Sequence, residues 1–359
     1  MPTIKDVAQK AGVSLTTVSR VLNGHPYVAD DVRTHVLDAI EALHYHPSRV
    51  AQRLRAAQSH LISVIVSDVK NPFYTLVLGG IEQVLSEQGL SVLIGNSDSS
   101  PDREDNLIAL MRAEDAAGLI IAPVREDSAL LAEVAHSGLP VVVIDRYLDS
   151  LKVDTVLADN RLGAYAAIQH LVQFGHKRIA ILNGPQYLTS GRERYDGFLQ
   201  AMEETGLPVD LELVRFGDYQ LESGYELTRD LLSLPEPPTA LFIANNLMTI
   251  GALNAIHEAH CRVPDDIAVV GFDDVPWAIS LNPPLTTVAQ PTFEIGVRAA
   301  ELLLSRIADP ERPPNTIVLS TQLMVRASCG GTGQQRQVTV PSGHQNLSQQ
   351  AHKAIITEP

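Results

Sequence analysis

Residues 15–23 combine short polar side chains and one arginine at helical spacing. Val18 and Leu22 fall on one face of the predicted helix. The opposite face carries Leu15, Thr16, Ser19 and Arg20. An arginine fork can pair bidentately with guanine O6 and N7, and a leucine can contact a thymine methyl. This face is therefore what a helix lying in the major groove of DNA would present.

A second chemistry is indicated where a predicted strand ends. The run Ile267–Gly271 is apolar, and Asp273 follows it after one further residue. A carboxylate at the end of a buried strand costs free energy unless it is used. In open parallel α/β sheets, ligands bind beyond the carboxyl ends of the strands. We therefore expect a ligand site among the residues that close such strands.

The first chemistry needs a helix-turn-helix to position it. Thr3 is the predicted N-cap of a first helix, with Asp6 in the capping-box position. Gly12 lies in a short turn, and Ser14 caps the second helix, which ends at about Asn23. A third predicted helix over residues 30–43 completes a small core with Val32, Val36, Ile40 and Leu43.

The second chemistry needs a parallel sheet. Beyond residue 60, short β-branched runs alternate with helical patterns. The predicted strands are apolar on both faces and hence buried: Leu61–Ser67, Leu90–Gly95, Gly118–Ala122, Val141–Ile144, Arg178–Leu182, Ala240–Ala244 and Ile267–Gly271. The predicted helices include Leu162–Phe174, Arg192–Glu204, Leu221–Leu232 and Leu247–Ala259. The alternation predicts an α/β fold with doubly wound parallel sheets, and its length indicates two similar lobes.

Composition excludes several classes of protein. The length of 359 residues predicts two or three domains. No apolar run approaches the roughly 18 residues that a membrane helix needs. The N-terminus does not resemble a secretory signal, and the two cysteines, Cys261 and Cys329, suit a reducing compartment. We therefore expect a cytoplasmic protein without contact to a membrane.

The charge is unevenly distributed along the chain. The formal net charge is −15, which on its own argues against a nucleic-acid partner. Residues 1–60, however, carry seven basic and five acidic side chains, a net charge of +2, and the other 299 residues carry −17. Such asymmetry between segments favours nucleic-acid contact by the basic one.

The motifs of common enzymes do not occur in the sequence. It has no Walker loop, no Gly-x-Ser-x-Gly elbow and no Gly-x-Gly-x-x-Gly after a strand. His257, His260 and Cys261 have a spacing that could place them on one helix face, but no fourth metal ligand accompanies them. We therefore expect no catalytic residues, no metal and no cofactor.

A resemblance to a known family lies in the N-terminal residues. Thr3–Gly24, which reads TIKDVAQKAGVSLTTVSRVLNG, and Tyr45–Leu54, which reads YHPSRVAQRL, resemble the headpiece and hinge of the lactose-repressor (LacI/GalR) family of bacterial transcription regulators. The resemblance implies that Leu15 and Thr16 face base edges, with Arg20 one turn further as the best chemical reader. Four further residues of the motif are better placed for contacts to phosphates: Ser14, Thr17, Ser19 and Asn23.

The resemblance also implies a hinge helix that begins at Ser48. Its Leu54 would wedge between base pairs in the minor groove, and Arg49 would contact phosphate or the groove. An isolated helix of this length is marginal in water, so it should form only when two copies pack together on DNA. The alternative for Leu54 is a linker residue that packs on its own domain.

The rest of the chain resembles the effector domain of the same family and the ribose-type periplasmic sugar-binding proteins. The resemblance is carried by short segments at strand ends: Lys70–Tyr74, Ile144–Arg146, Ala158–Asn160, Gly191–Phe198, Ala244–Asn246, Gly271–Asp274 and Thr287–Pro291. It implies a cleft with one wall of Asn71, Phe73, Tyr74, Asp145 and Arg146. The other wall and the hinge would contain Arg192, Tyr219, Asn245, Asp273 and Gln290.

This inventory suits a small neutral sugar. Carboxylates accept hydrogen bonds from hydroxyls, and aromatic rings cover the C–H faces of a sugar ring. Two aspartates and two arginines balance in charge, which favours an uncharged polyol, ribose-like pentoses first. Simpler alternatives are surface ion pairs for the charged residues and core packing for the aromatic ones. Trp277 could close the cleft or pack, and Asp159 is expected to cap a helix before it faces a ligand.

The sequence as a whole predicts a homodimeric transcription regulator that represses sugar-uptake or catabolic genes. It would bind a pseudopalindromic operator and be released by a small neutral sugar. We expect a headpiece over residues 1–47, a hinge over 48–60, a two-lobed effector and dimerisation domain over 61–329 and a disordered tail over 330–359. The alternatives are a hexose or nucleoside effector, a corepressor mode, and a transport or sensory sugar-binding protein.

Overall fold

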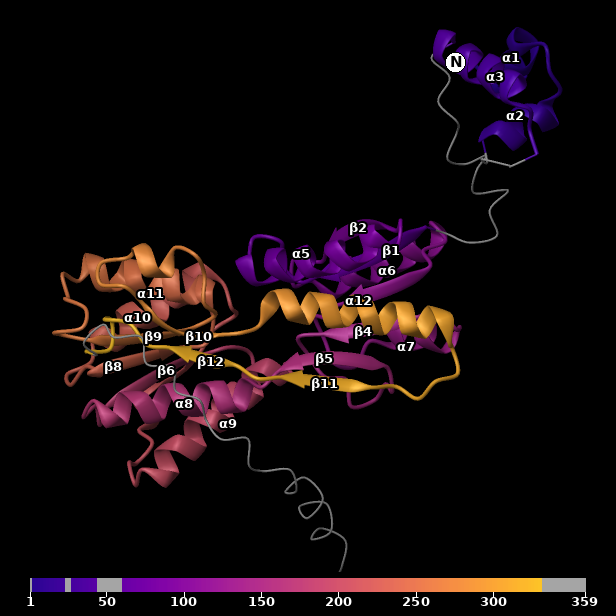
Figure 1. Cartoon of the computed structure of the whole chain (residues 1–359). Helices are drawn as coiled ribbons and strands as arrows, with labels where there is room; N and C mark the ends of the chain where they lie inside the picture. The colour runs from indigo at the N-terminus through magenta and orange to yellow at the C-terminus, as the bar shows by residue number, and fades with distance from the viewer. Residues whose placement is uncertain (1, 23–26, 44–59, 331–359) are drawn as a thin grey trace, which may run out of the picture. The chain divides into compact units, whose positions relative to one another are not determined.

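The computed structural model describes residues 2–22, 27–43 and 60–330, which belong to two units that divide after Ser59 (Figure 1). Asn23, the predicted hinge with Arg49 and Leu54, and the predicted tail from residue 331 lie outside the described residues. No helix within the described ranges is both long and apolar enough to cross a membrane.

The first unit is the predicted helix-turn-helix, with helices α1 (Ile4–Ala11), α2 (Leu15–Leu22) and α3 (Asp30–Ala42). The Thr3 amide donates to the Asp6 carboxylate over 2.7 Å, and the Ser14 hydroxyl accepts from the Thr17 amide over 3.1 Å. Both predicted caps are thus present. Gly12 ends α1 at φ +67°, a left-handed conformation that suits glycine.

The core of this unit is small and contains residues from all three helices. The buried members are Val7, Ala8, Val18, Val21, Val36 and Ala39. Val18 is buried as predicted, whereas Leu22 is only half-buried and Val21 takes the central place. The helices therefore leave the face of α2 that carries Leu15, Thr16 and Arg20 exposed to solvent.

The second unit contains two sheets of six strands each, which define its two lobes. The first-lobe sheet has the order β11-β5-β4-β3-β1-β2 and is parallel throughout, with β1 (Leu61–Val66), β2 (Ser91–Asn96), β3 (Gly118–Ile121), β4 (Val141–Ile144), β5 (Asp154–Ala158) and β11 (Thr316–Leu319). The second-lobe sheet has the order β12-β10-β9-β8-β6-β7, with β6 (Ile179–Asn183), β7 (Val214–Phe216), β8 (Ala240–Ile243), β9 (Ala268–Phe272), β10 (Thr286–Ala289) and β12 (Gln322–Met324), of which only β12 is antiparallel.

Helices cover both faces of each sheet, which confirms the predicted doubly wound architecture. The first lobe carries α5 (Pro72–Glu87), α6 (Pro101–Ala113), α7 (Ala129–His136) and α12 (Thr292–Ala308). The second lobe carries α8 (Asn160–Gln173), α9 (Thr189–Glu204), α10 (Leu221–Leu232) and α11 (Asn246–Glu258). Two short 3-10 turns, η1 (Leu211–Leu213) and η2 (Ala278–Ser280), complete this lobe.

The chain passes between the lobes three times. It leaves the first lobe after β5, returns through α12, and leaves again between β11 and β12 (Figure 1). Asp159 and Thr321 lie at two of these crossings, and the Thr321 hydroxyl donates to the Asp159 carbonyl over 3.1 Å. These crossings leave the carboxyl ends of strands from both sheets facing one cleft.

Some strand predictions need correction. The sequence pattern missed β5, β7, β10, β11 and β12, because these are short or contain polar residues such as Asp154 and Thr286. The prediction that the strand over Leu90–Gly95 is buried on both faces was wrong. It corresponds to β2, which is the edge strand of its sheet, and Ile94 there is 50% exposed.

Candidate functional site

The exposed face of α2 carries the predicted DNA-contacting side chains of the headpiece. Leu15 is 44% exposed although it is apolar, and Thr16 and Arg20 are exposed beside it. Thr17 and Ser19 are half-buried, and Ser14 is exposed at the N-terminus of the helix. The open face of α2 therefore presents one apolar and two polar side chains, Leu15, Thr16 and Arg20, to solvent.

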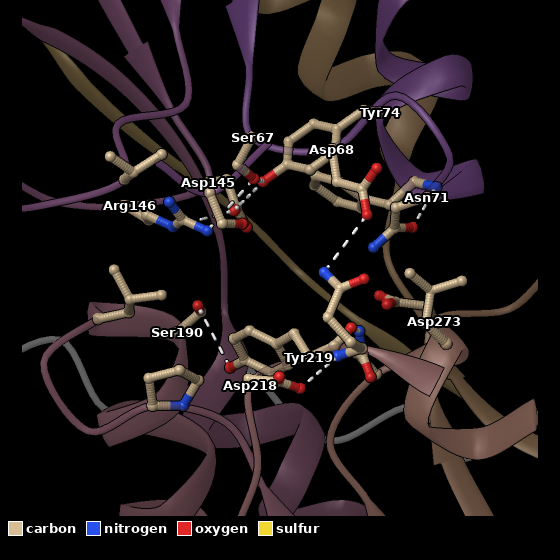
Figure 2. A pocket seen from close by; sticks show the side chains of 18 of the residues that line it. Ser67, Asp68, Asn71, Tyr74, Asp145, Arg146, Ser190, Asp218, Tyr219 and Asp273 are labelled. Carbon is tan, nitrogen blue, oxygen red and sulfur yellow. Dashed lines mark hydrogen bonds and ion pairs between the residues drawn. The ribbon is translucent and has the colours of Figure 1, made fainter. Parts of the chain in front are cut away.

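A cavity opens between the two lobes of the second unit (Figure 2). It encloses about 650 Å³ of space, including solvent at its mouth. Nine of the ten predicted effector residues line it: Asn71, Phe73, Tyr74, Asp145, Arg146, Tyr219, Asn245, Asp273 and Gln290. Residues far apart in the chain are thus brought together at the carboxyl ends of the strands.

A buried hydrogen-bond network organises the first-lobe wall (Figure 2). The Tyr74 hydroxyl donates to Asp145 over 2.9 Å and accepts from the Ser67 hydroxyl over 2.7 Å. Arg146 Nε lies 3.5 Å from the Asp145 carboxylate. Burial, with the Asp145 charge as a second cause, raises the pKa of the Tyr74 hydroxyl, which therefore stays a neutral donor.

The second-lobe wall is held by its own contacts. Gln290 Nε2 donates to Asp273 Oδ1 over 2.6 Å, and the Asn246 amide donates to the same carboxylate over 3.4 Å. Burial raises the pKa of the Asp273 carboxyl. Asn245 caps α11 and donates to the Tyr219 carbonyl over 2.9 Å. Asn245, Asp273 and Gln290 thus each have a hydrogen-bond partner within the protein.

The backbone at the cavity is locally strained. Seven non-glycine residues in the described ranges have positive φ, and four of them line the cavity: Ser99, Asp145, Tyr219 and Asp273. Such conformations cost of order 1 to 3 kcal/mol each and cluster at functional sites. Tyr219, at φ +68°, is unusual because its side chain is bulky. The strain supports a binding role for this cavity.

Gly184 makes room for the Tyr219 ring. A Cβ atom at Gly184 would lie 1.9 Å from Tyr219 Cζ. The residue follows β6 directly, so the ring packs over the carboxyl end of that strand. Only a glycine therefore permits this position of the ring.

Arg192 is the one predicted effector residue that does not line the cavity. Its guanidinium instead pairs with Glu126, with Nη2 and Oε2 2.9 Å apart. Arg194 lines the cavity in its place, is 3% exposed, and donates to Asn160 over 2.8 Å. Two residues turn about 200° around a helix, so the two arginines lie on different faces of α9.

Several lining residues were not predicted, among them Ser67, Asp68, Ser190, Arg194, Asp218 and Gln220. Ser67 and Asp68 directly follow β1, so the rule that function lies at strand ends could have found them. Asp218 and Gln220 follow β7, a strand too short and polar for its pattern to be recognised.

Two other candidate residues, Trp277 and Asp159, have structural roles. Trp277 packs against the second-lobe core and is not among the cavity-lining residues. Asp159 caps α8 by accepting from the Leu162 amide over 2.9 Å, as expected. In the described part of the chain, no three His, Cys, Asp or Glu side chains cluster as metal ligands would.

Comparison with known proteins gives one family match within each of the two units. Residues 3–48 match the model of bacterial regulatory proteins of the lacI family, and residues 168–329 match a periplasmic binding protein-like domain. The HTH-type transcriptional repressor PurR of Mannheimia succiniciproducens is 36% identical over 330 residues, 91% of this chain and 98% of that protein. The probable HTH-type transcriptional repressor ExuR of Bacillus subtilis is 35% identical, over 91% of this chain and 98% of that protein.

Solved structures agree with these relatives. The lac repressor dimer bound to operator and the anti-inducer ONPF is 31% identical, with a TM-score of 0.81, over 91% of this chain and 99% of that one. The transcriptional regulator CelR in complex with cellobiose is 34% identical, with a TM-score of 0.70, over 91% of this chain and 100% of that one. The chain therefore belongs to the lacI family of bacterial regulatory proteins.

Proposed function

We propose that this regulator represses transcription from a pseudopalindromic operator in the cytoplasm and is released by a small uncharged sugar in the cleft. Leu15, Thr16 and Arg20 would read base edges, and the phosphate contacts would come from Ser14, Thr17, Ser19 and Asn23. The hinge, with Arg49 and Leu54, would bind the operator centre. We assign the headpiece to residues 1–47, the hinge to 48–60 and the effector domain to 61–329.

The charge of the cavity supports an uncharged ligand. Its lining contains the four carboxylates Asp68, Asp145, Asp218 and Asp273, but only the two guanidinium groups of Arg146 and Arg194. An anionic ligand would meet net negative charge in a partly enclosed site, where repulsion is weakly screened. Hydroxyl groups, by contrast, donate well to carboxylates. This excess of carboxylates is the observation on which the proposal depends.

Both arginines of the cavity are already engaged by protein groups. Arg146 donates to the Pro123 carbonyl and lies 3.4 Å from the Ser67 hydroxyl. Arg194 donates to Asn160 and to the Ala244 carbonyl, and its guanidinium carbon lies 3.8 Å from the centre of the Phe272 ring. A phosphate or carboxylate ligand would have to compete for these donors.

One solved relative supports this class of ligand. CelR is described with cellobiose, a neutral sugar, which favours a hexose-based alternative to the ribose-like pentose. The effector would alter the angle between the lobes and so disfavour the paired hinge helices. The alternative is a corepressor mode, in which the ligand strengthens operator binding. In both modes, ligand and operator change each other's affinity by the same factor.

Fluorescence anisotropy on an operator selected from a random duplex library tests the proposal. Separate titrations would contain D-ribose, D-glucose, cellobiose, adenosine and D-ribose 5-phosphate. We expect a neutral sugar to weaken operator binding and the phosphate ester to have no effect. An unchanged affinity with ribose removes ribose, and a response to the phosphate ester alone contradicts the charge argument.

A further inference from the structure

An ion pair joins the two lobes outside the cavity lining. Glu126 follows β3 of the first lobe, and Arg192 lies in α9 of the second lobe. Arg192 Nη2 lies 2.9 Å from one carboxylate oxygen of Glu126 and 3.2 Å from the other. The Glu126 side chain is 19% exposed and that of Arg192 is 40% exposed. The pair is therefore at the rim, where water screens it only in part.

Thr189 adds a second connection at the same place. Its hydroxyl donates to Glu126 and accepts from the Tyr147 amide over 3.1 Å. Thr189 is buried and is the first residue of α9, whereas Tyr147 follows β4 of the first lobe. One end of α9 is thus bound to two loops of the opposite lobe.

Two further contacts between the lobes differ in kind. Gln220 donates to Asp68 over 3.4 Å, and Asn246 donates to Asn71 over 2.8 Å. Asp68, Asn71 and Gln220 line the cavity, so a ligand can compete for both of these hydrogen bonds. Glu126, Thr189 and Arg192 do not line it, and their contacts can persist whether or not a ligand is bound.

We infer that Glu126, Thr189 and Arg192 form a latch that favours closed lobes and so sets effector affinity without touching the effector. A ligand enclosed by both walls binds only the closed form, so its apparent affinity scales with the closed fraction. Loss of the latch therefore lowers the affinity of the cleft for every ligand by one common factor. A residue that contacts the ligand would instead change the ranking of ligands.

The latch and the effector act on the same equilibrium between open and closed lobes. Loss of the latch therefore shifts operator affinity of the ligand-free protein in the direction opposite to the effector. The expected change in operator affinity rests on the proposed function. The latch itself rests only on the contacts of Glu126, Thr189 and Arg192 between the lobes.

Amide hydrogen exchange of the ligand-free full chain tests the latch, because the Tyr147 amide donates across the lobes. Arg192→Gln and Thr189→Val are each expected to speed exchange of the peptide containing Tyr147 about two- to fivefold, the range of a single partly exposed pair. The matched control is Arg112→Gln, whose guanidinium pairs with Glu133 over 2.8 Å within the first lobe. It should leave that peptide unchanged.

A charge exchange separates the ion pair from a general loss of packing. Glu126→Arg alone should speed exchange, and Glu126→Arg combined with Arg192→Glu should restore much of the protection. Unchanged exchange in Arg192→Gln, an equal increase in Arg112→Gln, or no restoration in the double variant would each overturn the latch. If exchange responds but no tested sugar alters operator binding, the latch stands and the proposed effector class fails.

Discussion

Helix α2 of the first unit and the cleft between the lobes of the second unit differ in how they position their side chains. Eight consecutive residues form α2, and this one helix positions Leu15, Thr16 and Arg20. The cleft instead collects residues between Ser67 and Gln290 from strand ends of two sheets. The chemistry of the headpiece is exposed and solvated, whereas that of the cleft is buried, so each polar group there needs a partner. Substitutions in the cleft should therefore cost stability, and those on α2 should mainly cost recognition.

Arg194→Ala is expected to have the largest effect, a loss in the free energy of unfolding. The substitution leaves Asn160 and the Ala244 carbonyl without their donor and leaves the buried Asp273 without a nearby cation. Breaking a buried charged network typically costs about 3 to 5 kcal/mol. Urea unfolding followed by the fluorescence of Trp277, which packs in the same lobe, measures the loss.

Arg192→Ala is the matched control on the same helix. Its partly exposed ion pair should contribute about 1 kcal/mol or less to the free energy of unfolding. Equal losses in the two variants would contradict the distinction between a buried cavity residue and a rim residue.

The same contrast explains what the sequence could predict. The headpiece was predictable because local spacing and caps at Thr3 and Ser14 determine it. The strand pattern alone predicted cleft residues only where a strong apolar strand precedes a polar residue, as β9 precedes Asp273. Others, such as Tyr219 and Gln290, were predicted from the family resemblance. Asp218 follows the weak strand β7, and the choice between Arg192 and Arg194 depends on the rotation of α9 about its axis. The place of Asp218 in the cleft and the choice between the two arginines cannot be derived from the local sequence pattern, because long-range packing determines both.

Glu104→Gln compares a buried carboxyl of the first lobe with an exposed carboxyl of the headpiece. Glu104 is fully buried, and burial raises the pKa of its carboxyl to about 7, although the Val124 amide donates to it over 2.7 Å. The native state therefore holds a proton that the unfolded chain releases at lower pH, and stability falls as pH rises from about 4.5 through 7.

The glutamine variant cannot ionise, so it should gain up to about 3 kcal/mol over the parent at pH 8 and almost nothing at pH 4.5. Urea unfolding at the two pH values measures this difference. In the headpiece, the hydrogen bond from Thr3 lowers the pKa of the Asp6 carboxyl, so its contribution is lost as pH falls. A gain in Glu104→Gln that is independent of pH would show that packing, not ionisation, is responsible.

Arg20→Ala should affect recognition with little effect on the cleft. Arg20 is exposed, so its removal opens no cavity in the small core. Loss of a bidentate base contact costs about 1 to 3 kcal/mol of operator affinity and relaxes preference at one base pair per half-site. Anisotropy with operator variants at that base pair measures both effects. A uniform loss over all sequences would instead assign Arg20 to phosphate.

Ser14→Ala is expected to have the smallest effect. The Ser14 hydroxyl accepts from the Thr17 amide over 3.1 Å and lies 2.9 Å from the Thr17 hydroxyl, so it caps α2. Loss of such a cap costs about 1 kcal/mol of stability. Ser14→Asp retains the cap but adds negative charge where phosphate is expected. Both variants should weaken operator binding, but only Ser14→Ala should lower the melting temperature of the headpiece. If Ser14→Asp binds the operator normally, Ser14 acts only as a cap, and the DNA-facing surface of α2 begins at Leu15.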